Sequence, residues 1–396
     1  MGQDAAAAKS SPRLRIGFVA LLDAAPLIAA QELGYFQAEG LRVELERQIG
    51  WGNVRDKLVF GHLAASHALV GMSPVSLLGQ DRFPAPLTSI MSLGTGGNAI
   101  TLGRRLTDVG VDNLESLARY VSSRKRSQLP LIAHVFGCSM HHYLLRDWLA
   151  SGQIDPDNDV TLCVLPPSQM NRQLATGALD GFCAGEPWNT AAEHAGLGKI
   201  VAATTDLLPD HPEKVLATSQ RWLIGNEPVA EALIRAVLRG CQYCSDPANF
   251  PDLAKTLARP QYLDMAEAVV LKSLTLDRWY ARPGRRGATA LRNCSTAVTF
   301  PAVTHGLWLL DQMRRWGHVP PEVDVAAIAR AAVNTGPYRR AAAAMGLACP
   351  PDDLPPMRSA SGWFDPKQHS IAKQSTAVPS SAVGIRAPAV PQRQGV

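Results

Sequence analysis

The sequence lacks any run of apolar residues long enough to cross a membrane, and its first residues are poor in large hydrophobic side chains. A membrane helix needs about 20 apolar residues, and the apolar run at 16–22 stops at Asp23. Residues 1–12 are alanine-rich and polar and show neither the basic start nor the apolar stretch of a secretory signal. We therefore expect 1–12 to be a flexible N-terminus, the protein to be cytoplasmic, and no association with a membrane.

Charge is also scarce: 18% of the residues are charged, and the net charge is only +5 over 396 residues. The basic clusters at 124–126 and 285–286 have no interleaved aromatic residues, which indicates solvated loops rather than a nucleic-acid surface. The seven cysteines include one CxxC, Cys241 to Cys244, with no second CxxC and no paired histidines nearby. Alone it is weak evidence for a metal or redox site. We predict no metal and no cofactor.

Motifs of catalysis and phosphate binding are missing as well. There is no GxxxxGK[ST] loop, no GxGxxG after a strand and no GxSxG. The glycine-rich segment 94–101 has the spacing of neither nucleotide motif and is interpreted as a turn, with a small anion-binding nest as the alternative. Cys138 precedes His141 by three residues, but without a third orienting group this spacing does not predict a catalytic pair. The sequence does not favour an enzyme.

What the sequence does contain is an alternation of strand and helix patterns. A buried strand at 14–19 precedes a helix at 24–33, which Asp23 could cap, and an alternating strand follows at 41–48. A second series begins near Leu106, with strands at 129–136 and 159–167. This order is typical of parallel α/β sheets with helices on both faces. Two such lobes would leave a ligand cleft between them.

The same pass along the chain gives a domain division. We predict a first part of lobe 1 at 13–105, lobe 2 at 106–205, and a return to lobe 1 with C-terminal helices at 206–349. Residues 350–396 are rich in Pro, Ser and Ala and poor in large apolar residues, so we expect a disordered tail.

Several long motifs resemble those of one family. The segments "RIGFVALLDAAPLIAAQELGYFQAEGLRVEL", "HHYLLRDWLASGQIDP", "DGFCAGEPWN" and "DHPEKVLA" are similar to the nitrate- and bicarbonate-binding proteins of ABC transporters. The likeness runs from about residue 13 to 345. It implies a two-lobed α/β fold of the periplasmic-binding-protein type (type II), with a small oxyanion clamped in the interlobe cleft. By the same resemblance the ligand contacts fall on Trp51, Asn98, His141, Pro167 and Lys214, while Gly97, Glu186 and Trp188 line or brace the cleft.

The chemistry of these side chains agrees with that implication. Nitrate is a planar monoanion that only accepts hydrogen bonds, so a buried site must offer donors and a compensating charge. Lys214 would supply the charge and up to three donors, and Trp51, Asn98 and His141 one N–H each. Taken alone, each of these residues would more often have an ordinary structural role than bind a ligand. The family motifs favour ligand binding for Trp51, His141 and Lys214. The resemblance also implies that lysine at position 214 favours nitrate or nitrite over bicarbonate. A carboxylate such as Glu186 would repel an anion, so we interpret Glu186 as a brace.

Within this family, the expected cytoplasmic location and the lack of an ATPase motif point to the NasS-type nitrate/nitrite sensors. That resemblance implies a partner, an RNA-binding antiterminator of the NasT type with an ANTAR domain, which is held inactive and released when ligand binds. The sensor itself would then make no direct contact with nucleic acid. Two alternatives stay open: the substrate-binding component of a nitrate ABC transporter, and an enzyme on the same fold.

Overall fold

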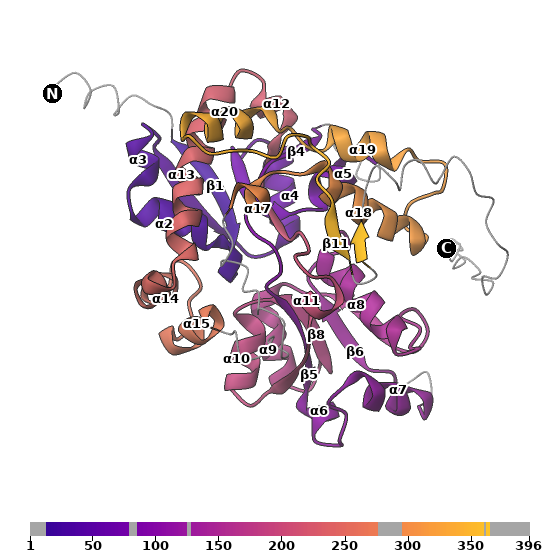
Figure 1. Ribbon diagram of the computed structural model, residues 1–396. Helices are drawn as coiled ribbons and strands as arrows, with labels where there is room; N and C mark the ends of the chain where they lie inside the picture. The colour runs from indigo at the N-terminus through magenta and orange to yellow at the C-terminus, as the bar shows by residue number, and fades with distance from the viewer. Residues whose placement is uncertain (1–12, 79–84, 125–127, 276–294, 360–361, 365–396) are drawn as a thin grey trace, which may run out of the picture.

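The computed structural model describes residues 13–78, 85–124, 128–275, 295–359 and 362–364. Each of two lobes is built on a five-stranded sheet, and the lobes lie one above the other in Figure 1. We call the lobe that carries the start of the chain the first lobe and the other the second lobe. The N-terminal and C-terminal parts of the described chain both belong to the first lobe (Figure 1).

The sheet of the first lobe has the strand order β2-β1-β3-β10-β4. Its strands are β1 (Leu14–Val19), β2 (Val43–Gln48), β3 (Ala65–Leu69), β4 (Leu87–Ser92) and β10 (Lys214–Ser219). β1 is parallel to β2 and β3, whereas β10 runs antiparallel to both of its neighbours. β3, β4 and β10 are buried along their whole length because helices cover both faces of the sheet.

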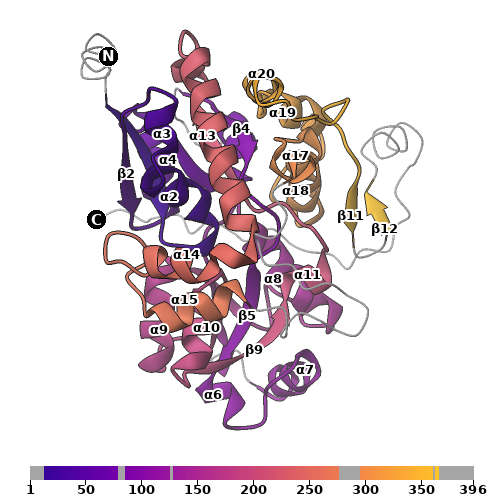
Figure 2. The same cartoon turned by 60° about the vertical axis from the view of Figure 1, so that its left-hand side comes forward.

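The helices of the first lobe come from both ends of the chain. Helix α13 packs against α2 and α20, far apart in sequence, and α18 packs against α19 (Figure 2). The early helices are η1 (Leu22–Ala24), α2 (Ala25–Glu32), α3 (Tyr35–Ala38), α4 (Trp51–Val59) and α5 (Met72–Leu77). The late ones are α12 (Gln220–Leu223), α13 (Glu227–Ser245), η3 (Pro247–Asn249), α14 (Phe250–Leu257), α15 (Glu267–Leu274), α17 (Thr296–Thr299), α18 (Val303–Arg315), α19 (Val325–Ala331) and α20 (Gly336–Ala344).

The sheet of the second lobe has the order β7-β6-β8-β5-β9. Its strands are β5 (Asn98–Gly103), β6 (Leu131–His134), β7 (Thr161–Val164), β8 (Gly181–Gly185) and β9 (Gly198–Ala203). Its helices are α6 (Arg104–Thr107), α7 (Leu114–Ser122), α8 (Met140–Ser151), α9 (Pro167–Ala175), α10 (Trp188–His194) and α11 (Thr204–Leu207). β6, β7 and β8 are parallel, and β5 is antiparallel to β8 and β9.

Within the described residues, two crossings join the lobes, one from β4 to β5 and one from β9 to β10. They run side by side in opposite directions: Thr95 pairs with Pro212, and the Gly96 N–H donates to the carbonyl of His211 at 2.9 Å. Gly96 and Gly97 have φ values of 70° and 86°, a left-handed region in which residues with a Cβ are strained. These two adjacent crossing segments form the connection about which the lobes could move.

The sheets differ from the sequence expectation in two respects. Both are mixed rather than parallel, because each receives one strand, β10 or β5, from a chain that enters from the other lobe. For the same reason β5 belongs to the second sheet, whereas the sequence division placed all of 13–105 in the first lobe. An alternating sequence pattern predicts a strand but not its direction or its partner strands, so the sequence could predict neither the mixed sheets nor the place of β5.

The expected disorder of 350–396 also needs a correction for its first part. β11 (Met357–Ser359) and β12 (Gly362–Phe364) form an antiparallel hairpin. The segment before it is held to the first lobe, since the Val303 N–H donates to the carbonyl of Asp353 at 2.9 Å and Thr304 donates to the carbonyl of Pro355 at 2.7 Å. Residues 1–12 and 365–396 lie outside the described residues. Among the helices that are described, none is long and apolar enough to span a membrane.

Candidate functional site

The five residues expected to contact a ligand stand at the beginnings of helices and strands. Trp51 opens α4 and Pro167 opens α9, and His141 lies in the first turn of α8. The N-terminal turn of a helix carries unpaired N–H groups and a partial positive charge, which favour an anion. Asn98 opens β5 and Lys214 opens β10. Because both strands run antiparallel to neighbours in their sheets, they begin at the edge where those neighbours end, the usual place for a ligand in an α/β sheet.

Lys214 is fully buried, and its ammonium lies between two carboxylates. Its Nζ is 2.9 Å from Oδ2 of Asp23 and also pairs with Glu213. Burial alone would lower the pKa of Lys214, but Asp23 and Glu213 together raise it. The Nζ also lies 5.5 Å from the centre of the Trp51 ring. The charge that the sequence predicted is therefore present and is held in place by other side chains of the protein.

Asp23 links this lysine to a buried histidine. Nε2 of His67 lies 2.7 Å from Oδ1 of Asp23, and the Val19 N–H donates to Nδ1 of His67 at 3.4 Å. Because Nδ1 of His67 accepts this hydrogen bond, the ring donates to Asp23 through Nε2. Burial alone would raise the pKa of Asp23, but Lys214 and His67 hold it well below its ordinary value. The predicted role of Asp23 as a helix cap is wrong, because α2 has no side-chain cap.

Glu213 joins the two lobes at the site. One carboxylate oxygen pairs with Lys214 of the first lobe, and the other, Oε1, accepts a hydrogen bond from Nδ2 of Asn98 in the second lobe at 2.6 Å. Nδ1 of His141 lies 3.7 Å from the same Oε1. One N–H of the Asn98 amide thus donates to Glu213, which leaves the second N–H for the predicted ligand contact.

Several polar atoms in this cluster have no hydrogen-bond partner among the residues that the structure describes. They are Nε1 of Trp51, Oδ1 of Asn98 and both ring nitrogens of His141. All three side chains are at most 2% exposed. Burial and then the Lys214 charge lower the pKa of His141 well below its ordinary value. Unpaired buried donors are costly and rare, so an indole N–H and an imidazole N–H without partners mark a place for a hydrogen-bond acceptor.

Gly185 leaves room beside these atoms. It pairs with Asn98 across β8 and β5. A Cβ at this position would lie 3.3 Å from Oδ1 of Asn98 and 3.9 Å from Nε2 of His141. The glycine that ends the "GFCAG" strand therefore preserves space at the two unpaired groups of the second lobe.

The residues expected to brace the cleft form contacts between the lobes. The carbonyl of Glu186 accepts from the Leu22 N–H of the first lobe at 2.8 Å, and the Glu186 N–H donates to the carbonyl of Gly97 at 3.0 Å. The Glu186 carboxylate accepts from the Thr190 N–H at 3.1 Å, within the first turn of α10. Nε1 of Trp188 donates to the carbonyl of Ala20 at 2.9 Å. These are structural contacts, as the interpretation of Glu186 required.

His142, the neighbour of the expected ligand contact His141, packs among other aromatic rings. Its ring stacks on Tyr143 and lies 4.2 Å from the His134 ring, centre to centre. Pro167 is buried at the start of α9. The preceding Pro166 approaches the first lobe, since a Cβ on Gly50 would lie 3.5 Å from it. The starts of α4 and α9 thus face each other across the interlobe seam.

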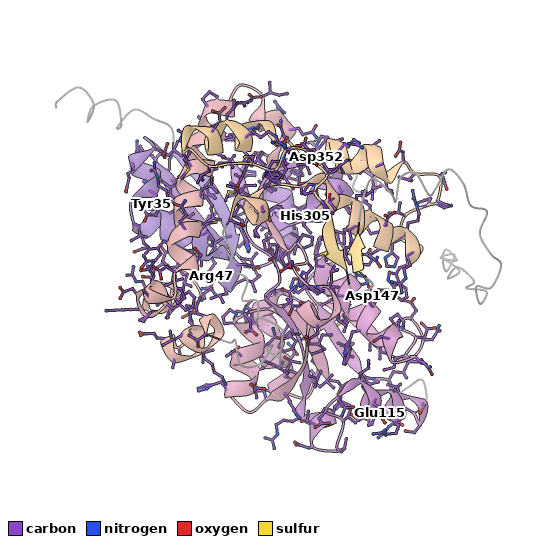
Figure 3. All side chains as sticks on the ribbon, viewed as in Figure 1. Tyr35, Arg47, Glu115, Asp147, His305 and Asp352 are labelled. Atoms are coloured by element: carbon purple, nitrogen blue, oxygen red, sulfur yellow. The ribbon has the colours of Figure 1, made fainter. Side chains whose placement is uncertain are left out.

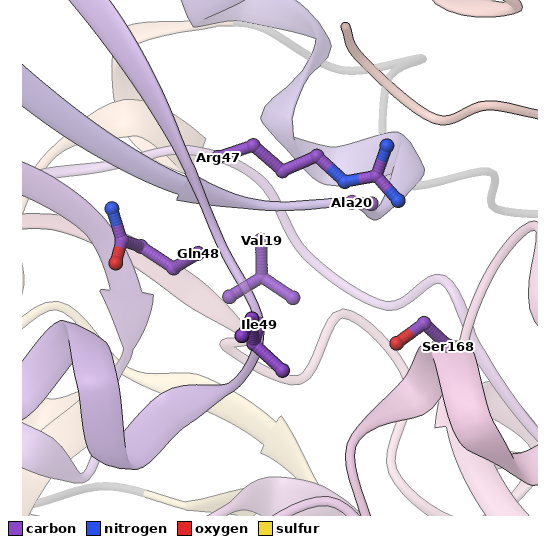
Figure 4. Close-up of a pocket in the computed structure, with 6 residues that line it drawn as sticks. All are labelled: Val19, Ala20, Arg47, Gln48, Ile49 and Ser168. Carbon is purple, nitrogen blue, oxygen red and sulfur yellow. The ribbon is translucent and has the colours of Figure 1, made fainter. Parts of the chain in front are cut away.

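A cavity of about 280 Å³ opens on this seam. Figure 4 shows Ser168 of α9 on one side and residues of β1 and β2 on the other. Arg47 reaches across the top of the view and donates to the carbonyl of Pro260 at 3.0 Å. The lining residues do not include the charged cluster, although Gln48 and Ile49 directly precede Gly50 and Trp51. The cavity is lined by Val19, Ala20, Arg47, Gln48, Ile49 and Ser168.

Sequence reasoning missed three members of the cluster, namely Asp23, His67 and Glu213. Glu213 could have been found from the sequence, because a carboxylate next to the lysine of an anion site needs a hydrogen-bond donor or a cation as its partner. Asp23 was visible as the charge that interrupts an apolar run, but only the fold brings it to β10 and β3. Among the described residues, no group of three or more His, Cys, Asp or Glu side chains could hold a metal ion.

Comparison with known proteins identifies the class. Residues 7–258 match the model of the NMT1-like family. The chain is 32% identical over 343 residues to the nitrate/nitrite binding protein NrtA of Synechococcus elongatus, covering 84% of this chain and 77% of that protein. It also resembles the bicarbonate transport ATP-binding protein CmpC of the same species, at 36% identity over 337 residues, or 84% of this chain. The chain spans about half the length of CmpC, 50%.

A solved structure gives the same result for the fold. The periplasmic nitrate-binding protein NrtA of Synechocystis superposes with a TM-score of 0.80 at 27% identity, over 93% of this chain and 99% of that one. The two-lobed periplasmic-binding-protein fold expected from the sequence is thereby confirmed. The chain belongs to the NMT1-like family and, within it, is a relative of the NrtA nitrate/nitrite binding proteins.

Proposed function

We propose that this protein binds nitrate or nitrite between its lobes. The observation that carries the proposal is the set of buried, unpaired donors on Trp51 and His141 beside the ammonium of Lys214. Nitrate accepts hydrogen bonds in its own plane from several directions, which suits N–H groups that come from two lobes. Bonds between such donors and an ion are worth about 1.5–3 kcal/mol each. Solved and curated relatives named as nitrate binders support the same ligand.

We further propose that binding has a regulatory output rather than a chemical one. In this proposal the protein is a cytoplasmic nitrate/nitrite sensor that holds a NasT-type ANTAR-domain antiterminator inactive and releases it with ligand. Support comes from the site itself, whose groups are divided between the lobes, so that ligand affinity depends on how the lobes are arranged. A partner that prefers one arrangement would then compete with ligand. The relatives are named as binding or transport proteins, which is why we propose no catalytic step.

A second candidate is the substrate-binding component of a nitrate transporter. It is favoured by the names of two relatives, since NrtA is a nitrate/nitrite binding protein and CmpC is a bicarbonate transport ATP-binding protein. The two roles share the ligand site and differ in the partner and the compartment.

The test begins with ligand binding. The purified protein should gain thermal stability with nitrate and nitrite and much less with chloride or bicarbonate; equal shifts with all four anions would contradict the proposal.

The regulatory role is tested with the partner. The protein should co-elute with the antiterminator and separate from it when nitrate is added. Retention of the complex at saturating nitrate would contradict the sensor role. Recovery of the native protein with the membrane transporter after cell fractionation would favour the second candidate.

A further inference from the structure

The charges of the buried cluster do not suit an anion as they stand. Two carboxylates, Asp23 and Glu213, face the single ammonium of Lys214 in the same group of contacts. Each of the three side chains is at most 5% exposed. Nδ1 of His67 accepts the Val19 N–H and so holds no proton, which leaves two carboxylates against one ammonium and a net charge of one negative. A monoanion placed here would add a second negative charge, and like charges in a poorly solvated interior repel strongly.

One change of protonation corrects this balance. Both ring nitrogens of His141 are buried and unpaired among the described residues, so the ring can take a proton without breaking a hydrogen bond. The resulting imidazolium would donate from one nitrogen to the anion and from the other, Nδ1, toward Oε1 of Glu213, 3.7 Å away. We infer that the site takes up its anion together with one proton, which His141 holds. The inference rests on the proposed function and adds the condition under which the site binds.

The other groups around His141 are worse acceptors for that proton. His67 uses Nδ1 to accept the Val19 N–H, and Asp23 is already paired with His67 and Lys214. Glu213 already accepts from Lys214 and Asn98, so protonation would cost a charge-assisted bond. The ring of His211 is engaged with Thr204 and the carbonyl of Pro212. Two further titratable groups lie nearby. Nδ1 of His134 contacts the carbonyl of Phe136. Burial raises the pKa of the Cys183 thiol well above its ordinary value.

The coupling has a definite sign. Without anion, burial keeps His141 neutral at neutral pH. A bound anion beside the ring favours the imidazolium, so binding and protonation support each other by linkage. One proton taken up per anion makes the dissociation constant rise about tenfold for each unit of pH between the pKa of His141 in the free protein and its higher pKa in the complex. Nitrate should therefore bind more tightly as the pH falls from about 8 to about 6.

Calorimetry on the full chain tests this directly. Nitrate is titrated near neutral pH in Tris and in HEPES at equal ionic strength, two buffers that differ in the heat they absorb on releasing a proton. A difference in the observed heats that corresponds to about one proton taken up per nitrate supports the inference. Equal heats, together with a dissociation constant that does not change with pH, overturn it while leaving nitrate binding intact. Absence of any binding heat or thermal shift at every pH would instead overturn the proposed function.

Two variants locate the proton. His141→Gln keeps an N–H donor but cannot titrate, so it should bind nitrate more weakly and with no proton uptake. His211→Gln, the matched change at the neighbouring buried histidine, should retain the uptake. Undiminished proton uptake by a folded His141→Gln protein would overturn the assignment to His141. The wild-type measurement in two buffers stays decisive if either variant fails to fold.

Discussion

The two lobes contribute different chemistry to the same buried cluster. From the first lobe come charged groups that are already paired with one another, Asp23 and Lys214, supported by His67. From the second come neutral groups, and His141 and Asn98 both keep atoms without a partner in the described part of the chain. The charged groups of the first lobe are therefore paired by the protein itself, whereas the neutral groups of the second lobe, and the indole of Trp51 in the first, still lack a hydrogen-bond partner in the described part of the chain. Changes to groups that are already paired and changes to groups that are unpaired should therefore have different signatures, in stability for the first and in affinity for the second.

The largest effect is expected on the charged side. Lys214→Ala should abolish the thermal shift produced by nitrate and should also cost about 3–5 kcal/mol of stability, because it leaves two buried carboxylates without their cation. Denaturant unfolding and a nitrate thermal-shift titration measure the two effects. Lys199→Ala removes the partly exposed partner of Asp112, 2.8 Å away, and serves as the control with no loss of either. A Lys214→Ala protein as stable as wild type would contradict the difference between the lobes.

Low pH should destabilise the second lobe through its buried His134. Burial lowers the pKa of His134 from 6.5 to about 4, so the folded protein holds this ring neutral. The stability from this group is complete above pH 6.5 and is lost as the pH falls toward 4, because only the unfolded chain takes up the proton. A shift of this size corresponds to about 3 kcal/mol.

Unfolding free energies between neutral pH and about pH 4 measure this loss. His134→Phe should remove part of the decline, whereas His62→Gln, at an exposed position, should leave it as in wild type. The same decline in the His134→Phe protein would exclude His134 as its source.

The unpaired indole gives the next effect. Trp51→Phe removes an N–H that has no partner in the described structure, so stability should change little while the nitrate dissociation constant rises by about 10-fold to 100-fold, as for one lost bond to an ion. Trp188→Phe is the matched change, because its N–H donates to the carbonyl of Ala20. That variant should instead lose stability. Isothermal titration and thermal unfolding on both proteins would reveal whether the two indoles have these separate roles; identical behaviour would refute them.

The smallest effect is expected at an exposed ion pair between the two lobes. Asp147 lies where α8 meets the C-terminal helices (Figure 3), and its Oδ1 is 2.9 Å from Nη1 of Arg315. Nearby, the hydroxyl of Tyr143 bonds to Nδ1 of His318 at 2.9 Å. Since Arg315 is 56% exposed, Arg315→Ala should cost only about 0.2–1 kcal/mol and should weaken nitrate binding at most a few-fold. The difference should vanish in high salt; a large, salt-independent loss would show that this pair holds the lobes together.

Local patterns were sufficient for much of the fold and for part of the site. The strand predicted at 14–19 has those bounds in the structure, and the helix predicted at 24–33 is present as α2, Ala25–Glu32. Family motifs then pointed to Trp51, His141 and Lys214, which the structure brings together. Asp23 was given the wrong role because a carboxylate before a helix usually caps it, and nothing local shows that β3 and β10 bring His67 and Lys214 to it. Strand direction and pairing across distant segments depend on the whole chain.

The place of β10 in the first sheet has a consequence for biosynthesis. All five strands of the second sheet lie within residues 98–203, so that sheet can be complete before β10 leaves the ribosome. The first sheet cannot be, because β10 lies between β3 and β4 and is their shared neighbour. The first part of the chain to be translated should therefore finish folding after the middle part, and the lysine at the start of β10 completes the sheet and the charged cluster together. Pulse proteolysis of stalled nascent chains should show protection of 98–203 before protection of 87–92.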